Sequence, residues 1–349
     1  MNQKTVSENP QGKYRLDRFI EAQKRDYETA LREIKNGRKR SHWIWYIFPQ
    51  IKGLGFSPTS EYYGIDGLEE AKAYWQNAYL RAHLLEITKA LLALETSDPT
   101  QVMGYPDDLK LRSSMTLFSL TAPDEPVFQA VLEKYFNGQP DQQTVRETAI
   151  SVEQMRASDA YTIEHFVESK ELMYRAADGV FRAYDGWQDK RIAILAGGGN
   201  NGGDGYALVG ILWKNDIPVT VFQVSDKLSE DGKYYYEDAL RNGADIRVFS
   251  EETALSEYDV IVDCILGTGF SGEVRGMAGT AITAINHAHA FVISVDINSG
   301  LNGDTGEGTL AVRSDLTVSI GYYKKGLFTG DAPRLIGRLC NVDIGIVLV

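Results

Sequence analysis

Two aspartates in this 349-residue sequence, Asp263 and Asp296, stand where apolar segments end and glycine-containing loops begin. An ionised carboxylate among apolar residues costs free energy unless a cation or hydrogen-bond donors compensate its charge. A single aspartate in such a place could simply cap the turn that follows. Two in corresponding places favour a polar site, in which carboxylates transfer protons or help to bind a cation.

A third loop, residues 197–205, follows another apolar segment and carries Asn200, Asn201 and Asp204 among its glycines. Glycine lets the backbone approach a ligand closely, and the amides at the start of a helix favour phosphate. The loop fits the Gly-x-Gly-x-x-Gly pattern of dinucleotide binding, but a dehydrogenase would end the next strand with an acid, where this sequence has Gln223. The polar side chains favour further coordination or hydrogen bonding, and a tight Asx-rich turn is the simpler alternative.

Oxygen atoms from these loops also suggest a site for a hard cation. Asn201, Asp263 and Ser299, together with backbone carbonyls, could supply such a site. Because the set contains so few carboxylates, a monovalent ion fits it better than calcium or magnesium.

The segments around these loops alternate between strand-like and helical patterns. This alternation predicts an α/β domain with a Rossmann-like, mostly parallel sheet and helices on both faces. Reactive residues of such sheets lie beyond the carboxyl ends of the strands, where all three loops would fall. The predicted strands are 191–196, 219–223, 246–249, 260–265, 292–296 and 316–320, with helices at 205–213, 234–242 and 278–289. Two further helices precede them, at 151–166, which opens on a capping box from Ser151 to Gln154, and at 170–184.

A small all-α domain is predicted before the α/β domain, with helices at 16–34, 67–76, 78–94, 109–120 and 125–136. We expect the helical domain to span residues 14–146 and the α/β domain residues 150–349. Basic residues precede Trp43 and Trp45, which could form an anion-binding patch that stacks a base. The alternative is that the cations end a helix while the tryptophans fill the core, and this interpretation is favoured. Whether His42 is functional stays open.

Composition narrows the class of protein. A mass of 38.9 kDa favours two domains. Cys264 and Cys340 are the only cysteines, which excludes a disulfide framework and a cysteine-based zinc cluster. Residues 1–150 carry 19 basic and 20 acidic side chains and residues 151–349 carry 17 and 28, so nucleic-acid binding is disfavoured. No apolar run is long enough to cross a membrane, and a cytoplasmic location is expected.

These motifs together resemble the YjeF N-terminal family, the NAD(P)H-hydrate epimerases, over residues 150–349. The resemblance rests on Met155 with Asp159, the 197–205 loop, Asp263-x-x-x-Gly267-Thr268-Gly269, Asp296-x-x-Ser299-Gly300-Leu301 and Lys324-x-Gly326-Leu327. Residues 14–146 resemble an uncharacterised bacterial all-helical family with a His-Trp-x-Trp-x-x-Phe-Pro-Gln signature, here beginning at His42. That second resemblance supplies a fold but no reaction.

The first resemblance implies an isomerase that interconverts the R and S forms of hydrated NADH and NADPH (NADHX and NADPHX) at nicotinamide C6. This repair step would feed a separate S-specific dehydratase. One potassium ion per subunit would be held by Asn201, Asp263 and Ser299, and a homodimer is usual among relatives. We hypothesise that Asp296 is the general acid and base. The implied substrate contacts are Asn200, Asn201, Gly202, Gly203, Asp204, Gly267, Thr268, Gly269, Phe270, Ser271, Gly272, Glu273 and Asp296.

Three segments depart from the family pattern. Residues 173–177 read Met-Tyr-Arg-Ala-Ala where Met-Glu-Asn-Ala-Gly is frequent, Asn298 replaces a common proline, and Tyr323 stands where a proline often precedes the lysine. No proposed ligand is lost, and altered specificity or reduced turnover stays open.

The alternative function is a non-catalytic nucleotide- or RNA-binding scaffold with the same fold. The intact polar residues of the three loops favour the enzyme, and the acidic charge disfavours RNA. A nicotinamide dehydrogenase is disfavoured by Gln223 and by the absence of an evident histidine or lysine partner for hydride transfer.

Overall fold

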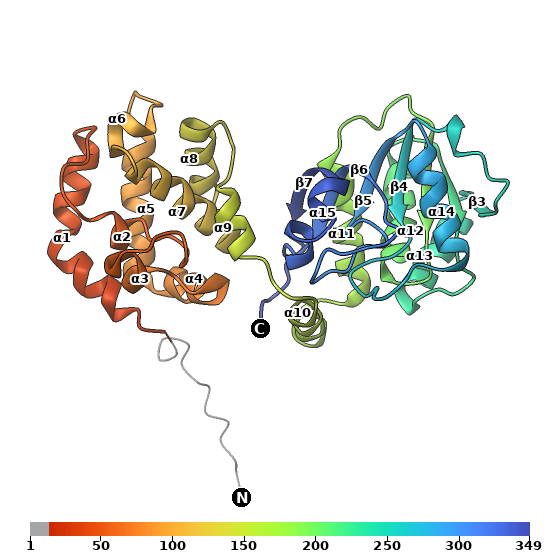
Figure 1. Cartoon of the computed structure of the whole chain (residues 1–349), viewed down its shortest axis with the longest axis horizontal. Helices are drawn as coiled ribbons and strands as arrows, with labels where there is room; N and C mark the ends of the chain where they lie inside the picture. The colour runs from red at the N-terminus through yellow and green to blue at the C-terminus, as the bar shows by residue number, and fades with distance from the viewer. Residues whose placement is uncertain (1–13) are drawn as a thin grey trace, which may run out of the picture. The chain divides into compact units, whose positions relative to one another are not determined.

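Figure 1 shows the computed structural model of the chain, in which residues 14–349 are described. The chain divides into two compact units, one ending at Thr148 and the other beginning at Ala149. Within the described residues, no helix is long and apolar enough to cross a membrane.

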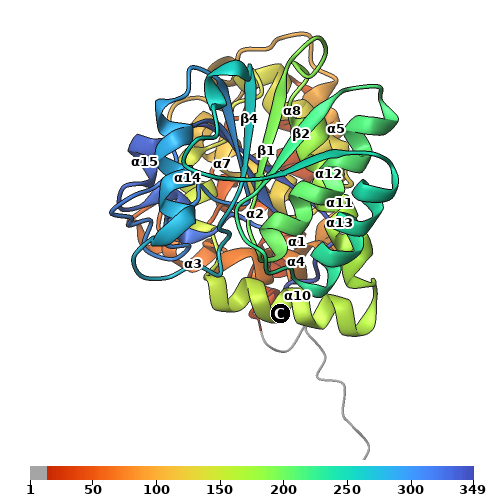
Figure 2. The same cartoon turned by 90° about the vertical axis from the view of Figure 1, so that its right-hand side faces the viewer.

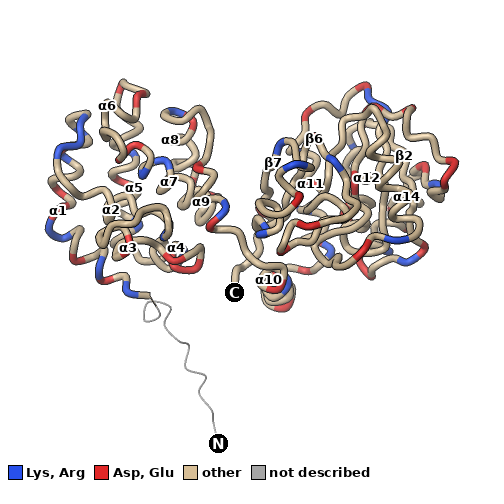
Figure 3. The backbone as a smooth tube through the Cα atoms, in the orientation of Figure 1, with Lys and Arg blue, Asp and Glu red and all other residues tan. Residues whose placement is uncertain are grey.

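The first unit is built from helices. Its elements are α1 (Asp17–Lys35), α2 (Ile44–Ile47), α3 (Pro58–Tyr63), α4 (Gly67–Gln76), α5 (Ala78–Leu92), α6 (Pro99–Met103), α7 (Asp107–Thr121), α8 (Pro126–Phe136) and α9 (Gln142–Glu147). The five longest match the five helices predicted from the sequence. The short ones were not predicted, because four to six residues are too few to display a helical period. Along α1, basic and acidic segments are interspersed, as Figure 3 shows.

The aromatic segment of this unit is anchored by Glu33 of α1. Trp43 is buried, and its indole Nε1 donates a hydrogen bond of 2.8 Å to the Glu33 carboxylate. Burial alone would raise the pKa of Glu33, but hydrogen bonds from Ser41, Arg40 and Trp43 lower it to about 2. His42 is exposed. Trp43 therefore fills the core, as the favoured interpretation holds.

The second unit contains one seven-stranded sheet in the order β3-β2-β1-β4-β5-β6-β7. The strands are β1 (Ile192–Ala196), β2 (Val219–Gln223), β3 (Asp245–Val248), β4 (Val260–Cys264), β5 (Phe291–Val295), β6 (Ser314–Ile320) and β7 (Ile336–Val342). Every neighbouring pair is parallel, which confirms the predicted Rossmann-like architecture. The strand order reverses between β1 and β4, where sheets of this type form a crevice at their carboxyl edge.

Helices cover both faces of the sheet. The helices of this unit are α10 (Val152–His165), α11 (Ser169–Ala183), α12 (Asn200–Lys214), α13 (Glu230–Arg241), α14 (Gly276–His287) and the short α15 (Ala332–Leu335), with single 3₁₀ turns at Leu255–Glu257 and Lys325–Phe328. In Figure 2, α14 lies on one side of β1 and β4, and α11, α12 and α13 lie on the other.

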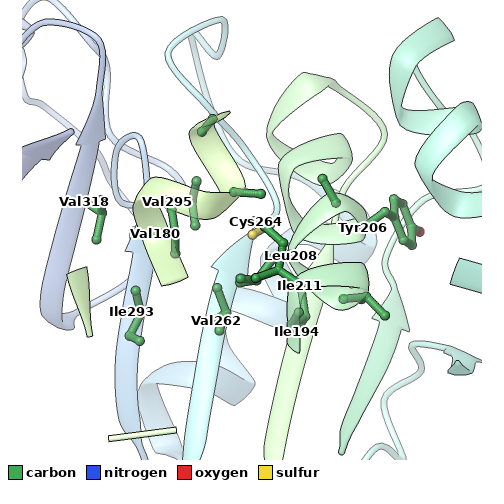
Figure 4. Packing of buried hydrophobic residues seen from close by; sticks show 14 of the residues in the cluster. Val180, Ile194, Tyr206, Leu208, Ile211, Val262, Cys264, Ile293, Val295 and Val318 are labelled. Atoms are coloured by element: carbon green, nitrogen blue, oxygen red, sulfur yellow. The ribbon is translucent and has the colours of Figure 1, made fainter. Parts of the chain in front are cut away.

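Alternating residues of each strand supply the two cores. Ile194 of β1 and Val262 of β4 pack with α11 and α12, as Figure 4 shows, whereas Ala193 and Leu195 face the cluster that contains α14. This alternation follows from the two-residue period of a strand. Strands buried on both faces read as continuous apolar runs, which is why the sequence revealed them.

Two predicted helix starts are wrong, and α13 begins at Glu230 and not at residue 234. The helix after β1 begins at Asn200 and not at Gly205, so the polar residues of the 197–205 segment form its first turn. Gly199 is its N-cap, and the Gly203 amide donates to the Gly199 carbonyl at 3.1 Å. Glycine and asparagine are poor helix formers, so the local pattern indicated a loop, and packing against β1 and β4 overrides that preference.

Candidate functional site

A cavity of about 580 Å³ lies at the carboxyl edge of the sheet. It is bounded by the segment between β1 and α12, the loop after β4, the end of β5, and helices α10 and α11. Of the residues predicted to touch substrate, its lining contains Asn200, Asn201, Asp204, Gly267, Thr268, Gly269, Phe270 and Asp296. The three loops singled out in the sequence therefore meet at one place.

Other predicted contact residues do not line this cavity. Ser271, Gly272 and Glu273 are exposed, and Glu273 pairs with Arg275 at 3.1 Å. Gly202 and Gly203 are buried in the first turn of α12. A Cβ at Gly202 would lie 2.0 Å from the Gly197 carbonyl oxygen, so this glycine permits close backbone packing.

Asp263, at the end of β4, is fully buried and accepts hydrogen bonds from four donors. Ser294 Oγ donates at 2.8 Å, the Ser299 amide at 2.9 Å, the Ser299 hydroxyl at 2.5 Å and the Ile265 amide at 3.3 Å. Burial raises the pKa of Asp263, and the hydrogen bonds oppose that shift. Protein donors therefore supply part of the compensation that its charge requires, and they fix Ser299 against it.

Asn201 has an unusual environment. Its side-chain Oδ1 and Nδ2 are both buried, and neither has a hydrogen-bond partner among the described residues. A buried amide left unpaired in this way costs about 1–3 kcal/mol, so such a group points to a ligand that is bound in use. A Cβ at Gly267 would lie 3.2 Å from the Asn201 Cβ and 3.8 Å from Asp296 Oδ2, which places this amide beside the cavity.

Asp263 and Ser299, the other two residues predicted to bind a cation, are hydrogen-bonded to each other and do not line this cavity. Asn201, Asp263 and Ser299 offer an amide, a carboxylate and a hydroxyl oxygen, and the set contains a single negative charge. Within residues 14–349, no group of three or more His, Cys, Asp or Glu side chains is arranged to hold a metal ion.

Asp296 leaves β5 in the left-handed backbone region, with φ of 67°. Its carboxylate forms an ion pair with the ammonium group of Lys324. Lys324 is only 1% exposed, and its Nζ also donates to the Ile320 carbonyl at 2.8 Å. A strained, non-glycine backbone that aims a carboxylate into a cavity is a frequent feature of functional sites.

Two further carboxyl groups face the same cavity. Burial raises the pKa of Asp159, on α10, to about 6, with a smaller contribution from Asp296 and opposition from Lys324. Burial, followed by the charges of Asp296 and Asp159, raises the pKa of Asp204 well above its usual range. Asp159, Asp204 and Asp296 therefore lie near a single buried cation, Lys324. This excess of carboxyl groups favours their protonated forms or the binding of a positively charged group.

Sequence reasoning missed Asp159 and Lys324 as members of the site. Both residues belong to motifs on which the family resemblance rests, and these motifs were the only sign in the sequence that the two residues belong to the site. It also missed an apolar wall that α10, α11 and the C-terminal segment provide through Met155, Leu172, Met173 and Ile344. Such a wall suits a flat ring better than a phosphate.

The raised pKa of Asp159 predicts a pH-dependent gain in stability for Asp159→Asn. An unfolded aspartate titrates near 3.9. Between that value and about 6 the folded protein holds a proton that the unfolded chain releases, so the free energy of unfolding falls as pH rises through this window. The neutral asparagine avoids this loss, and we expect it to stabilise the protein by about 2 kcal/mol at pH 7.5.

Urea unfolding at pH 7.5 and pH 3.5 tests this expectation. The two proteins should be equally stable at pH 3.5, where both side chains are neutral. Asp178→Asn is the control, because Asp178 forms a surface ion pair with Arg182 at 2.7 Å, and its effect should be within about 0.5 kcal/mol at both values. A loss of stability in Asp159→Asn at pH 7.5 would contradict the assignment of a buried, unfavourable charge.

Comparison with known proteins decides the family of the second unit. Residues 169–326 match the family described as YjeF-related protein N-terminus. An NAD(P)H-hydrate epimerase of Limosilactobacillus fermentum is 35% identical over 203 residues, covering 56% of this chain and 97% of that protein. The chain belongs to this family. An NAD(P)H-hydrate epimerase of Oenococcus oeni is similarly close, at 36% over 205 residues, 56% of this chain and 96% of that protein.

A longer relative of this epimerase family also matches the second unit. The bifunctional NAD(P)H-hydrate repair enzyme Nnr of Coxiella burnetii is 34% identical over 198 residues, which is 55% of this chain and 40% of that protein. A yeast protein of known structure is 20% identical, with a TM-score of 0.46 and coverage of 55% of this chain and 86% of that one.

The first unit matches a different family. Residues 13–148 correspond to a family described as protein of unknown function. A solved structure of a conserved hypothetical protein from Mycobacterium tuberculosis is 43% identical, with a TM-score of 0.38, and covers 39% of this chain and 97% of that one.

Proposed function

We propose that the second unit interconverts the R and S epimers of NADHX and NADPHX, a metabolite-repair reaction. The observation that carries this proposal is the meeting of Asp296 with the segments after β1 and β4 around one cavity. Family membership supplies the substrate class, since the relatives described above carry the name NAD(P)H-hydrate epimerase.

The chemistry of the substrate suits this cavity. C6 of the hydrated ring carries a hydroxyl and is bonded to the ring nitrogen. Inversion at C6 requires a bond there to break and form again, and the nitrogen can stabilise the cationic or ring-opened intermediate. A positioned side chain that transfers a proton to and from the reacting oxygen typically raises the reaction rate by about 10²–10⁴-fold. We assign that role to Asp296.

Different walls of the cavity would contact different parts of a dinucleotide. The first turn of α12, from Asn200 to Asp204, presents backbone amides and polar side chains to the more charged part of the ligand. Met155, Leu172 and Met173 offer an apolar surface for a ring. Ser271, Gly272 and Glu273 stay part of the proposed contact set, on an exposed loop that adjoins the cavity.

Potassium is the proposed cofactor, one ion per subunit. Asn201, Asp263 and Ser299 would hold it, and the unpaired buried amide of Asn201 supports this assignment. When bound, the ion would supply positive charge that offsets Asp263 and would orient the loop after β4. The reaction needs no redox step.

Exchange of potassium for choline at equal ionic strength is expected to lower the melting temperature of the protein. A ligand at ten times its dissociation constant stabilises a folded protein by about 1.4 kcal/mol. Asn201→Ala should abolish the difference between the two salts, because it removes the amide oxygen. The measurement is a thermal melt in each salt, with Asn215→Ala as the control, since Asn215 caps the far end of the same helix. Equal melting temperatures for the wild type in both salts would rule out a folded-state potassium site.

The direct test of function is an epimerisation assay. Purified full-length protein is mixed with the R-hydrate and an S-specific dehydratase in potassium buffer, and loss of the R form is followed by chromatography. We expect the loss to exceed the spontaneous rate clearly. If it does not, the scaffold interpretation replaces the enzyme.

The proposed partners follow from the reaction. A separate NAD(P)H-hydrate dehydratase would consume the S epimer, and the bifunctional name of the Coxiella burnetii relative supports this pairing. We further propose a homodimer in the cytoplasm. The formal net charge of −12 disfavours a nucleic-acid partner.

A further inference from the structure

We propose that Asp159 is the second proton-transfer residue of the epimerase, which protonates the hydroxyl that leaves C6 while Asp296 accepts a proton from the incoming water. This inference rests on the proposed function and assigns a catalytic role to a residue that sequence reasoning left out of the site.

Asp159 and Asp296 reach the cavity from different elements. Asp296 follows β5, whereas Asp159 lies on α10, whose neighbours are the loops after β4, β5 and β6. Arg156 Nη2 of α10 donates to the Gly269 carbonyl at 3.5 Å, and the Val152 amide donates to Asp304 at 2.8 Å. Helix α10 thus forms one wall of the cavity, and Asp159 and Asp296 line that cavity from different elements.

The two acids differ in their partners, and this difference matches the two roles. Asp296 is held by the ammonium of Lys324, and the ion pair requires its carboxylate form, which is a base. Among the described residues Asp159 has no hydrogen-bonded cation, and it is half-buried in the cavity wall. Burial raises the pKa of Asp159 to about 6, so at neutral pH a useful fraction carries the proton that an acid must donate.

The charged groups that line the same cavity are Arg156 on α10, Asp204 on α12, Asp231 on α13, Asp296 and Lys324. Asp204 is a poorer candidate than Asp159, because it lies in the first turn of α12, which is proposed to contact the more charged part of the ligand. Asp231 and Arg156 contribute charge at the wall without entering the causes of the Asp159 shift. Asp159 is therefore the acid of this cavity that is best placed to give a proton to the ring.

The proposed step balances as follows. The C6–O bond breaks with its electron pair on oxygen, Asp159 gives that oxygen a proton, and water leaves. The ring nitrogen donates its lone pair to form an iminium ion, which the carboxylate of Asp296 stabilises electrostatically. Water attacks C6 from the opposite face, and its proton passes to Asp296. Proton exchange with solvent then restores the starting state, and no oxidant, reductant or other reactant is needed.

The test compares full-length wild type, Asp159→Asn, Asp159→Glu and the surface control Asp178→Asn. Epimer interconversion is measured directly by chromatographic separation of R and S forms, from pH 5 to 9. We expect Asp159→Asn to lower kcat about 100-fold with KM changed less than threefold. The wild-type kcat should fall as pH rises above about 6. This decrease in kcat should be absent from the pH profile of Asp159→Asn and present again in that of Asp159→Glu.

The outcomes separate this inference from the proposed function. An inactive wild type overturns the function itself, whereas an active wild type with an equally fast Asp159→Asn overturns only the role of Asp159. A variant that is slow but keeps the wild-type decrease in kcat with rising pH would show that Asp159 acts through packing. Misfolding cannot mimic the expected result, because Asp159→Asn is expected to be more stable than wild type at pH 7.5.

Discussion

Purified Asp296→Ala protein is expected to interconvert the R and S hydrates at least 100-fold more slowly than wild type. The alanine removes the one carboxylate that is both paired with Lys324 and exposed to the cavity between the segments after β1 and β4. Loss of a positioned acid or base typically costs 10²–10⁴-fold in rate. A residual rate above the spontaneous reaction is expected, because the cavity still binds and orients the ring.

The effect on rate must be separated from an effect on folding. Removal of Asp296 leaves the ammonium of Lys324, which is 1% exposed, without its countercharge. An unpaired buried charge destabilises a protein by about 3–5 kcal/mol. The double variant Asp296→Ala/Lys324→Met removes both charges and should recover stability without recovering rate. If Asp296→Ala is as fast as wild type, the assignment of this residue as acid and base is wrong.

The fold of the second unit could be predicted because its central strands β1 and β4 are buried on both faces, whereas the partly buried edge strand β7 is missing from the prediction. Strands buried on both faces read as uninterrupted apolar segments, and a parallel sheet places all their carboxyl ends on one edge. That rule alone predicts that the 197–205 segment and the loops that begin at Asp263 and Asp296 lie together. The first unit was predicted less completely, because helices of one turn, such as α2, have no period to detect.

The members of the site that were missed depend on tertiary structure. Lys324 follows Tyr322 and Tyr323 in a segment with no apolar period. The neighbouring sequence therefore does not predict that its ammonium group is buried against Asp296. Asp159 lies on a helix whose buried residues, Val152, Met155, Ser158 and Thr162, are half polar, so its sequence pattern does not separate the buried face from the exposed one. Its raised pKa arises from burial in the cavity wall, and burial of a helix face against loops distant in sequence is not encoded locally.

The glycines of the 197–205 segment were assigned a single purpose from the sequence, and the structure divides them into two classes. At Gly197 an added Cβ would lie 1.9 Å from the carbonyl oxygen of Ile265, and at Gly202 it would lie 2.0 Å from the carbonyl oxygen of Gly197. At Gly199 no atom lies within 4 Å of the added carbon, and this residue lines the cavity. In the first class, Gly197 permits close packing of the segment after β1 against the segment after β4, and Gly202 permits close packing of α12 against Gly197. The second class leaves room for a ligand.

This division predicts opposite results for two substitutions that are identical in chemistry. Gly197→Ala must move the backbone after β1 away from that after β4 by more than 1 Å, since a real Cβ contact of this kind is not below about 3 Å. The packing of the central strands would be disturbed, and overpacking of this kind costs about 1–3 kcal/mol or more. We expect a large fall in melting temperature and loss of soluble, folded protein.

Gly199→Ala should leave the fold intact and impair binding. Its backbone has φ of −96° and ψ of −167°, which alanine adopts without strain, so the melting temperature should stay within about 2 °C of wild type. The added methyl group enters the space through which a phosphate or ribose would approach the start of α12. KM for the hydrate should rise about tenfold or more while kcat changes little, because Gly199 carries no group that transfers a proton. A Gly199→Ala protein with wild-type KM would show that the ligand does not approach along this turn, and the proposed orientation of the dinucleotide in the cavity would have to be reversed.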